Sequence, residues 1–229
     1  MQDYIKLFDA DYCDSLIHRL IRLNLWVDGR NTTTGVFKSL KKSVEMDGDA
    51  RYTKQLTQEL AKTISDNEEV EKLVFIHSIN GLLINKYEKG GHYGGHFDSP
   101  EIGGTSHNYS FTIFLNDDYR GGELVVEDKI IKPKQGHIYI YPSDKFHSVN
   151  EVTAGTRFAI IGWLKSRYLQ DHIRESVRDM LDVREYLLDT YGMDDEMYKK
   201  ANKTLINLMR NFTQWKRKQP KINLTSCII

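Results

Sequence analysis

Hydrophobic residues recur at helical spacing in two stretches near the start of the chain. In residues 10–25, ADYCDSLIHRLIRLNL, apolar side chains return every three or four positions behind acidic residues that suit a first helical turn. Residues 51–67, RYTKQLTQELAKTISDN, show the same period. The pattern therefore predicts two amphipathic helices, separated by a polar stretch that WVDGR at 26–30 introduces.

From Val74 to about Lys165 the pattern changes to short runs of strand length, rich in Val, Ile, Tyr, Phe and Thr. Turn residues separate the runs, and eight or so such strands with close turns favour a sandwich or jelly roll over βαβ units. Helical spacing returns after Ser166 and predicts two or three C-terminal helices. The runs are VFIHSIN, GLLINKYE, NYSFTIFLND, GGELVVED, KIIKPKQ, GHIYIYPS, FHSVNEV and TRFAIIGWL.

These patterns predict an α+β protein in which N-terminal and C-terminal helices flank a jelly-roll core. We expect a first domain at residues 1–165, with its β core starting near residue 74. A helical extension at 166–219 should pack on the sheet or on another subunit, which makes a homo-oligomer possible. We expect residues 220–229 to form a flexible tail.

The charge balance of the 229 residues limits the partners. The formal net charge is zero, so no overall field draws the chain to nucleic acid or to an anionic membrane. We interpret the basic residues Lys216, Arg217, Lys218 and Lys221 as a solvated helix end, with contact to nucleic acid as the alternative. Cys13 and Cys227, the two cysteines, form no C-x-x-C pair, which argues against a disulfide framework or a zinc ribbon. Without a secretory signal or an apolar stretch of ~18 residues, we expect a cytoplasmic protein with no membrane partner.

The first candidate chemistry lies in YEKGGHYGGHFD at 87–98. It ends on His96 and Asp98, whose side chains share one face of an extended chain because strand side chains alternate. Two histidines and one carboxylate on one face of iron(II) make a facial triad, so this pair needs one more histidine. His92 and His96 have the spacing of a helical zinc pair, but the four glycines of the stretch disfavour a helix at ~1 kcal/mol each.

Two residues further along the chain extend this candidate site. His147 lies in YPSDKFHSVNEV, where one strand bends into the next, and such a place can return a histidine to the metal from the opposite sheet edge. Arg157 follows ten residues later and shares a strand face with Ala159. Its planar fork suits a bidentate grip on a carboxylate of a small dianion, with a strand-edge salt bridge as the alternative.

Together these features resemble a known family. The chain is similar to the iron(II)- and 2-oxoglutarate-dependent dioxygenases of the prolyl 4-hydroxylase-like superfamily, and it more closely resembles the bacterial and phage PKHD-type hydroxylases. The resemblance spans nearly the whole length. Besides the C-terminal helices, the segments that carry it are WVDGR at 26–30, NKYEKGGHYGGHFD at 85–98, YSFTIFLNDDYRGGELVVED at 109–128 and YPSDKFHSVNEVTAGTR at 141–157.

The resemblance implies a double-stranded β-helix, or jelly roll, that binds iron(II) through His96, Asp98 and His147. It also implies that Arg157 holds the distal carboxylate of 2-oxoglutarate and that Tyr87 donates a hydrogen bond to this co-substrate. The implied cofactors are iron(II), 2-oxoglutarate and O2, with ascorbate as a reductant. Three further residues are expected either to line the cofactor pocket or to be ordinary core positions: Thr112, Leu124 and Trp163.

The implied reaction is hydroxylation of an unactivated C–H bond, and analogy with the superfamily suggests a prolyl residue of a peptide or protein. Free amino acids, siderophore-related metabolites and lysyl side chains are alternative substrates. A non-catalytic jelly-roll metal-binding module and a zinc- or manganese-dependent cupin enzyme are alternatives from other classes. The polar loop at 99–108 suits either a lid over the site or an inert turn.

Overall fold

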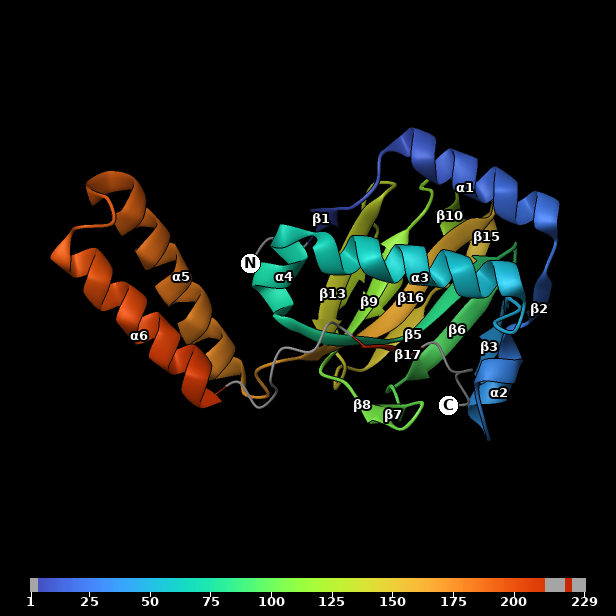
Figure 1. Ribbon diagram of the computed structural model, residues 1–229. Coiled ribbons are helices and arrows are strands. Elements are labelled where there is room, and N and C mark those ends of the chain that lie inside the picture. The colour runs from blue at the N-terminus through green and yellow to red at the C-terminus, as the bar shows by residue number, and fades with distance from the viewer. Residues whose placement is uncertain (1–3, 213–220, 224–229) are drawn as a thin grey trace.

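Two β-sheets of unequal size form the centre of the protein (Figure 1). The structure, a computed structural model, describes residues 4–212 and the backbone of residues 221–223. In spatial order the larger sheet contains β1 (Ile5–Lys6), β13 (His137–Pro142), β9 (Tyr109–Phe114), β16 (Arg157–Ser166), β5 (Ile76–Tyr87), β4 (Val44–Met46) and β2 (Trp26–Asp28), with β17 (Lys221–Asn223) parallel to β5.

The smaller sheet contains, in spatial order, β12 (Lys129–Ile131), β11 (Leu124–Val126), β14 (His147–Val149), β6 (His92–His96) and β3 (Lys41–Lys42). Its strands are all antiparallel to their neighbours. Two short antiparallel pairs complete the strands: β7 (Glu101–Ile102) with β8 (Thr105–Ser106), and β10 (Arg120–Gly121) with β15 (Val152–Ala154). The two sheets share one cavity, which confirms the expected jelly-roll core.

Two helices cover the outer face of the larger sheet (Figure 1) and confirm the predicted N-terminal helices: α1 (Ala10–Leu23) and α3 (Arg51–Asp66). The Asp9 carboxylate caps α1 by accepting a hydrogen bond from the backbone N–H of Tyr12 at 2.7 Å. Leu20 of α1 and Leu60 of α3 are fully buried in the main core between helices and sheet. Three short helical elements were not predicted: the 3₁₀ helix η1 (Gly29–Thr32), α2 (Phe37–Leu40) and α4 (Glu68–Val74).

Strands β5 and β16 separate the core from the cavity. They pair antiparallel along most of their length, so that Arg157 lies opposite Tyr87. Alternation directs Ile84 and Ile160 into the helix-covered core, whereas Tyr87 and Arg157 line the cavity. The sequence indicated two separate runs on either side of Gly81. The structure has one strand there, because Gly81 takes a φ of 52° within the strand and makes no turn.

The C-terminal helices α5 (Asp171–Tyr191) and α6 (Glu196–Phe212) pack together and stand away from the sheets (Figure 1). An apolar cluster that includes Phe75, Val177 and Leu205 holds the base of this hairpin to the body. No helix in the described part of the chain is long and apolar enough to cross a membrane. Residues 221–223 of the expected tail form β17, and the rest of the tail and the basic residues 216–218 lie outside the described residues.

Candidate functional site

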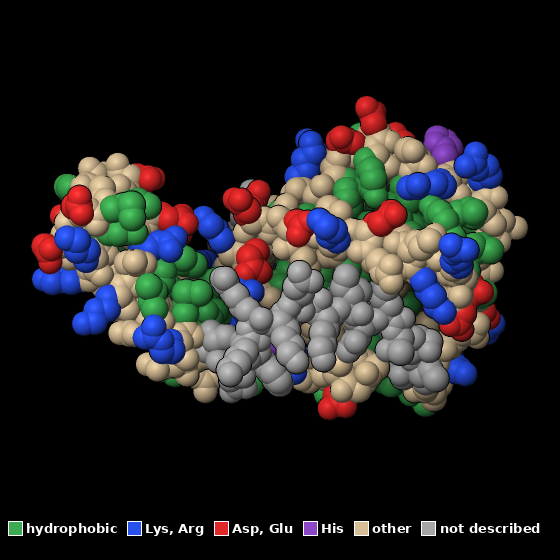
Figure 2. Space-filling model, in the orientation of Figure 1, with side chains coloured by type: hydrophobic (Ala, Val, Ile, Leu, Met, Phe, Trp, Pro, Cys, Tyr) green, Lys and Arg blue, Asp and Glu red, His purple; other side chains and the backbone are tan. Residues whose placement is uncertain are grey.

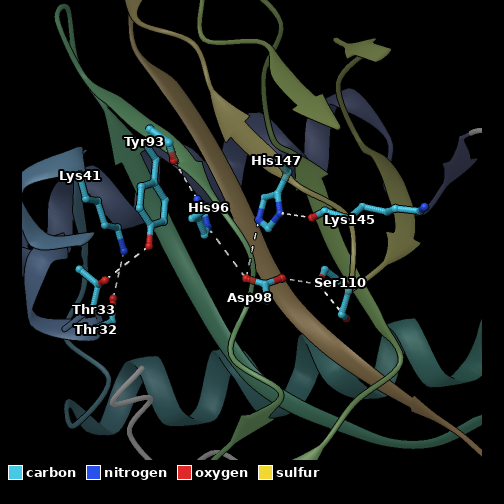
Figure 3. Close-up of polar contacts among 11 residues, drawn as sticks. Thr32, Thr33, Lys41, Tyr93, His96, Asp98, Ser110, Lys145 and His147 are labelled. Carbon is cyan, nitrogen blue, oxygen red and sulfur yellow. Dashed lines mark hydrogen bonds and ion pairs between the residues drawn. The ribbon is translucent and has the colours of Figure 1, made fainter. Parts of the chain in front are cut away.

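Three side chains of metal-ligating type converge where β6 and β14 lie side by side (Figure 3). His96 ends β6 and pairs directly with His147, the first residue of β14, and Asp98 follows β6. One ligand atom from each residue lies within 4.8 Å of the other two. The Oδ1 atom of Asp98 is 4.0 Å from Nε2 of His96 and 3.7 Å from Nε2 of His147. The structure thus brings together the three residues that the sequence singled out.

Backbone contacts orient both imidazole rings for metal binding. Nδ1 of His96 lies 2.9 Å from the carbonyl oxygen of Gly94, and Nδ1 of His147 lies 3.0 Å from that of Lys145. A carbonyl oxygen accepts only, so Nδ1 carries the proton in each neutral ring, and the lone pair is on Nε2. Both Nε2 atoms face the same carboxylate, and this is the tautomer that a metal ion requires.

The carboxylate is held in a similar way. Ser110 of β9 donates a hydrogen bond to Oδ2 of Asp98 at 2.5 Å, and its hydroxyl also lies 2.9 Å from that of Ser143. Oδ1 of Asp98 therefore remains the oxygen that faces the two histidines (Figure 3). Burial, followed by the proximity of His147, lowers the pKa of His96 to about 4. Its imidazole is neutral at neutral pH, and the donor set fits iron(II) in a facial arrangement.

A β-bulge in the glycine-rich stretch gives β6 its shape. His147 pairs with His96, but Val149 pairs with Tyr93, so β6 has one more residue than β14 between these two pairs. Gly94 and Gly95 of β6 thus lie opposite the single residue Ser148 of β14. As a result Tyr93 and His96 lie on the same side, with their rings stacked at 3.8 Å between centroids.

Arg157 lies in the same cavity and is 1% exposed. None of its three guanidinium nitrogens has a hydrogen-bond partner among residues 4–212. The group lies over the rings of Tyr87 and Phe114, at 5.1 and 5.3 Å from their centroids. Burial raises the pKa of Tyr119, and the charge of Arg157 and a polar contact of its guanidinium with the phenol oppose that effect, although this contact lacks the geometry of a hydrogen bond. A neutral phenol does not balance a buried cation, so the site fits an anionic ligand.

Tyr87 is buried beside this arginine. Desolvation raises the pKa of its phenol to about 12, although the Arg157 charge acts in the opposite direction. The hydroxyl therefore stays protonated and can donate a hydrogen bond to an anion that Arg157 holds. Arg157 does not form the strand-edge salt bridge that was its alternative interpretation, since no carboxylate pairs with it among the described residues.

The cavity between the sheets has a volume of about 310 Å³. It contains the three expected lining residues, Thr112, Leu124 and Trp163, each at most 3% exposed. The indole Nε1 of Trp163 has no hydrogen-bond partner in the described chain. The loop expected at 99–108 forms the β7–β8 hairpin, whose Ile102 packs on Trp163 and Leu83. Of the residues expected in this loop, Ser99 lines the cavity.

A further wall of the cavity comes from the polar stretch before α3, and no pattern in the sequence predicted it. Thr33, Thr34, Phe37 and Lys41 line the cavity because β3 pairs with β6. Lys41 forms an ion pair with Glu45 at 3.5 Å, and both side chains are only 3% exposed.

Lys41 also connects this wall to the metal ligands. Its Nζ lies 5.2 Å from the ring centroid of Tyr93, which stacks on His96. Thr33 contacts the hydroxyl of Tyr93 at 3.5 Å (Figure 3). The i, i+4 spacing of Lys41 and Glu45 is the one hint that the sequence offered for this pair, and it is a common spacing.

Comparison with known proteins gives consistent matches. A protein family described as the 2OG-Fe(II) oxygenase superfamily matches residues 82–165. A PKHD-type hydroxylase of Prochlorococcus marinus is 33% identical over 205 residues, covering 85% of this chain and 92% of the relative. Another from Idiomarina loihiensis is 32% identical over 192 residues, covering 81% and 87%.

A solved structure described as a Pseudomonas putida prolyl-4-hydroxylase has a similar fold. It superposes with a TM-score of 0.50 at 16% identity, covering 72% of this chain and 92% of that one. At this identity the likeness concerns the fold alone.

Proposed function

Because this chain belongs to the PKHD-type hydroxylases of the 2OG-Fe(II) oxygenase superfamily, we propose that it hydroxylates a prolyl residue of a peptide or protein. It is an iron(II)- and 2-oxoglutarate-dependent dioxygenase. One observation carries the proposal: a His-Asp-His cluster shares one cavity with a buried arginine that no carboxylate of the described residues neutralises. A non-catalytic binding module needs no such combination.

In this proposal His96, Asp98 and His147 hold the iron. When bound, iron(II) with 2-oxoglutarate and O2 supplies the oxidation that inserts a hydroxyl into an unactivated C–H bond and releases succinate and CO2. The chain positions the reactants: the Gly94 and Lys145 carbonyls fix the two imidazole tautomers, and Ser110 fixes the carboxylate.

Arg157 would pair with the distal carboxylate of 2-oxoglutarate, and the protonated Tyr87 would donate a hydrogen bond to it. This assignment supplies a negative charge to a buried guanidinium that forms no ion pair within residues 4–212. Thr112 and Leu124 would border the co-substrate, and Trp163 would form the wall next to the β7–β8 hairpin. These apolar surfaces exclude water from the reacting atoms.

The charges of the cavity support a peptide over a free amino acid. Its charged lining residues other than histidine are Lys41, Asp98 and Arg157. Asp98 would bind iron and Arg157 would bind 2-oxoglutarate, while Lys41 already pairs with Glu45. No unpaired charge of the lining then remains for the ammonium and carboxylate of a free amino acid, whereas a prolyl residue within a chain carries neither.

The test combines spectroscopy with a product screen. Anaerobic addition of iron(II) and 2-oxoglutarate should give a visible charge-transfer band, and no band in a folded protein would contradict the iron and co-substrate assignments. Prolyl peptides and free metabolites are then incubated with O2, and the product is identified by the mass gain of one oxygen atom together with stoichiometric succinate. Hydroxylation of free amino acids but of no peptide would overturn the substrate proposal. A cupin enzyme that uses zinc or manganese would form no succinate.

We also propose that residues 1–165 act as the dioxygenase domain and residues 166–219 as a helical extension that joins two copies. The strand that carries Arg157 ends at Ser166, and exposed apolar side chains gather on the hairpin (Figure 2). Tyr186, Met193 and Met197 are each more than half exposed there. A monomeric mass by light scattering at micromolar concentration would contradict this assembly. Cys13 is buried and forms no disulfide with any residue that the structure describes, which supports a reducing, cytoplasmic setting.

A further inference from the structure

Two exposed phenylalanines lie next to the metal ligands. Phe97 stands between His96 and Asp98 in the sequence and is 59% exposed. Phe146 directly precedes His147 and is 47% exposed. Their rings meet edge to face, with centroids 5.2 Å apart and planes at 60°. We name this pair the aromatic ledge.

The ledge is held rigidly although it is exposed. The ring of Phe146 lies on the bare backbone of Gly95, where an added Cβ would come within 2.3 Å of the ring. The carbonyl oxygen of Phe146 accepts a hydrogen bond from the backbone N–H of Glu127 at 2.8 Å. Neither ring belongs to an apolar cluster of the described core. Folding therefore explains how the rings are positioned but not why they face solvent.

The ledge is continuous with the catalytic cavity, because Phe97 is itself a lining residue. Phe37 of α2, which is 39% exposed, also lines this cavity. The charged lining residues all have partners in the proposed complex, as described above. The exposed residues of the lining are thus Phe37, Phe97 and the uncharged Thr34, so they offer mainly aromatic surface and no charge to a substrate that extends out of the cavity.

We propose that Phe97 and Phe146 form a binding subsite for an apolar side chain of the polypeptide substrate, next to the residue that is hydroxylated. This inference rests on the proposed function. An extended chain advances ~3.3 Å per residue. Phe97 is adjacent to two metal ligands in the sequence, so its ring is within reach of the first or second neighbour of a residue positioned at the iron. An apolar side chain of the substrate packs on aromatic rings, whereas a charged side chain at the same substrate position loses hydration there without gaining an ion pair from the two phenylalanines.

The test uses synthetic peptides of equal length with one central proline. The residue before or after the proline is alanine, leucine, phenylalanine, aspartate or lysine, and kcat/KM for hydroxylation is measured by mass spectrometry. The wild-type enzyme should prefer leucine or phenylalanine over alanine by about tenfold at one of the two positions. Phe97→Ala and Phe146→Ala should reduce this ratio to about twofold or less, whereas Phe97→Tyr keeps the ring and should retain the ratio.

Ile130→Ala is the matched control, because Ile130 is 69% exposed on β12 and does not line the cavity. It should keep the wild-type ratio. Binding of fluorescent peptides to manganese-loaded, 2-oxoglutarate-saturated protein gives a second readout without turnover, and the same preference should appear there. If Phe146→Ala fails to fold, the peptide preference of Phe97→Ala alone tests the proposal, since the Phe97 side chain is mostly in solvent and its removal should not prevent folding.

The outcomes separate the two proposals. If the wild type hydroxylates no prolyl peptide, the proposed function is wrong and the ledge has no peptide to bind. If it hydroxylates peptides without regard to the neighbouring residue, or keeps its preference in both alanine variants, the ledge proposal is wrong and the proposed function stands.

Discussion

Replacement of Arg157 by methionine should change stability and co-substrate binding in opposite directions. In the ligand-free protein the guanidinium is 1% exposed and its nitrogens have no hydrogen-bond partner among the described residues. Methionine has a similar length and no charge. The variant should therefore fold more stably without ligand and should lose the affinity for 2-oxoglutarate.

The magnitudes follow from the cost of burying a charge. Replacing buried ionic groups by apolar side chains of similar volume is neutral to stabilising by about 1–4 kcal/mol. For a chain of this size each kcal/mol raises Tm by about 2–4 °C, so a stabilisation of this size corresponds to a rise of about 2–16 °C. Removing one partner of a buried charge pair costs about 3–5 kcal/mol, which weakens 2-oxoglutarate binding by at least about 100-fold.

Both effects can be read by thermal unfolding with manganese(II) in place of iron, so that no turnover occurs. A ligand at 100 times its Kd stabilises the folded state by about 2.7 kcal/mol, so 2-oxoglutarate should raise the Tm of the wild type clearly. The same addition should leave the Tm of Arg157→Met unchanged. Calorimetric titration then gives the two Kd values.

Arg174→Met provides a matched control. Arg174 is also buried, at 3% exposure, but its guanidinium donates to the carbonyl of Tyr168 and pairs with Asp171. Its loss should lower the free energy of unfolding by about 1–3 kcal/mol and leave 2-oxoglutarate binding intact. A destabilised Arg157→Met that still binds 2-oxoglutarate normally would refute our account of the buried arginine.

Four further predictions concern the metal site and the core. Asp98→Ala should abolish the visible charge-transfer band and succinate formation. Ser110→Ala should weaken metal affinity by about 10- to 100-fold, because the Ser110 hydroxyl fixes the carboxylate of Asp98. Equal metal affinities of Ser110→Ala and the wild type in a titration would contradict this. In metal-free protein, the lowered pKa of His96 makes folding stability fall by up to about 3 kcal/mol as the pH drops from about 6.5 to about 4, since the unfolded chain binds the proton first. Urea unfolding at several pH values measures this, and His96→Gln should flatten the profile. Burial raises the pKa of the Cys13 thiol to about 12, so native Cys227→Ser protein should resist iodoacetamide until guanidinium unfolds it.

The periodicity of hydrophobic residues predicted the helices and strands that bury one regular face. The stripes of α1 and α3 and the alternation in β16 each bury a regular set of side chains, so their positions follow from the sequence alone. Alternation also placed Arg157 on the cavity face. The pairing of β3 with β6 had no such signal, because β3 is two residues long and its partner is rich in glycine. The wall that contains Lys41 was therefore missed.

The separation of His96 and Asp98 by one residue predicted that their side chains lie together, and the structure has them so, although the glycine-rich stretch before them departs from simple alternation. The glycines were expected only to disfavour a helix, and the structure has a strand there with a bulge at Gly94 and Gly95. Simple alternation would put Tyr93 and His96, three residues apart, on opposite faces. The extra residue of the bulge brings both to the cavity, and Leu40 and Phe146 pack on the bare glycine backbones. The glycines thus allow two neighbouring elements to approach β6 closely, and they place an aromatic ring against the imidazole that would bind iron.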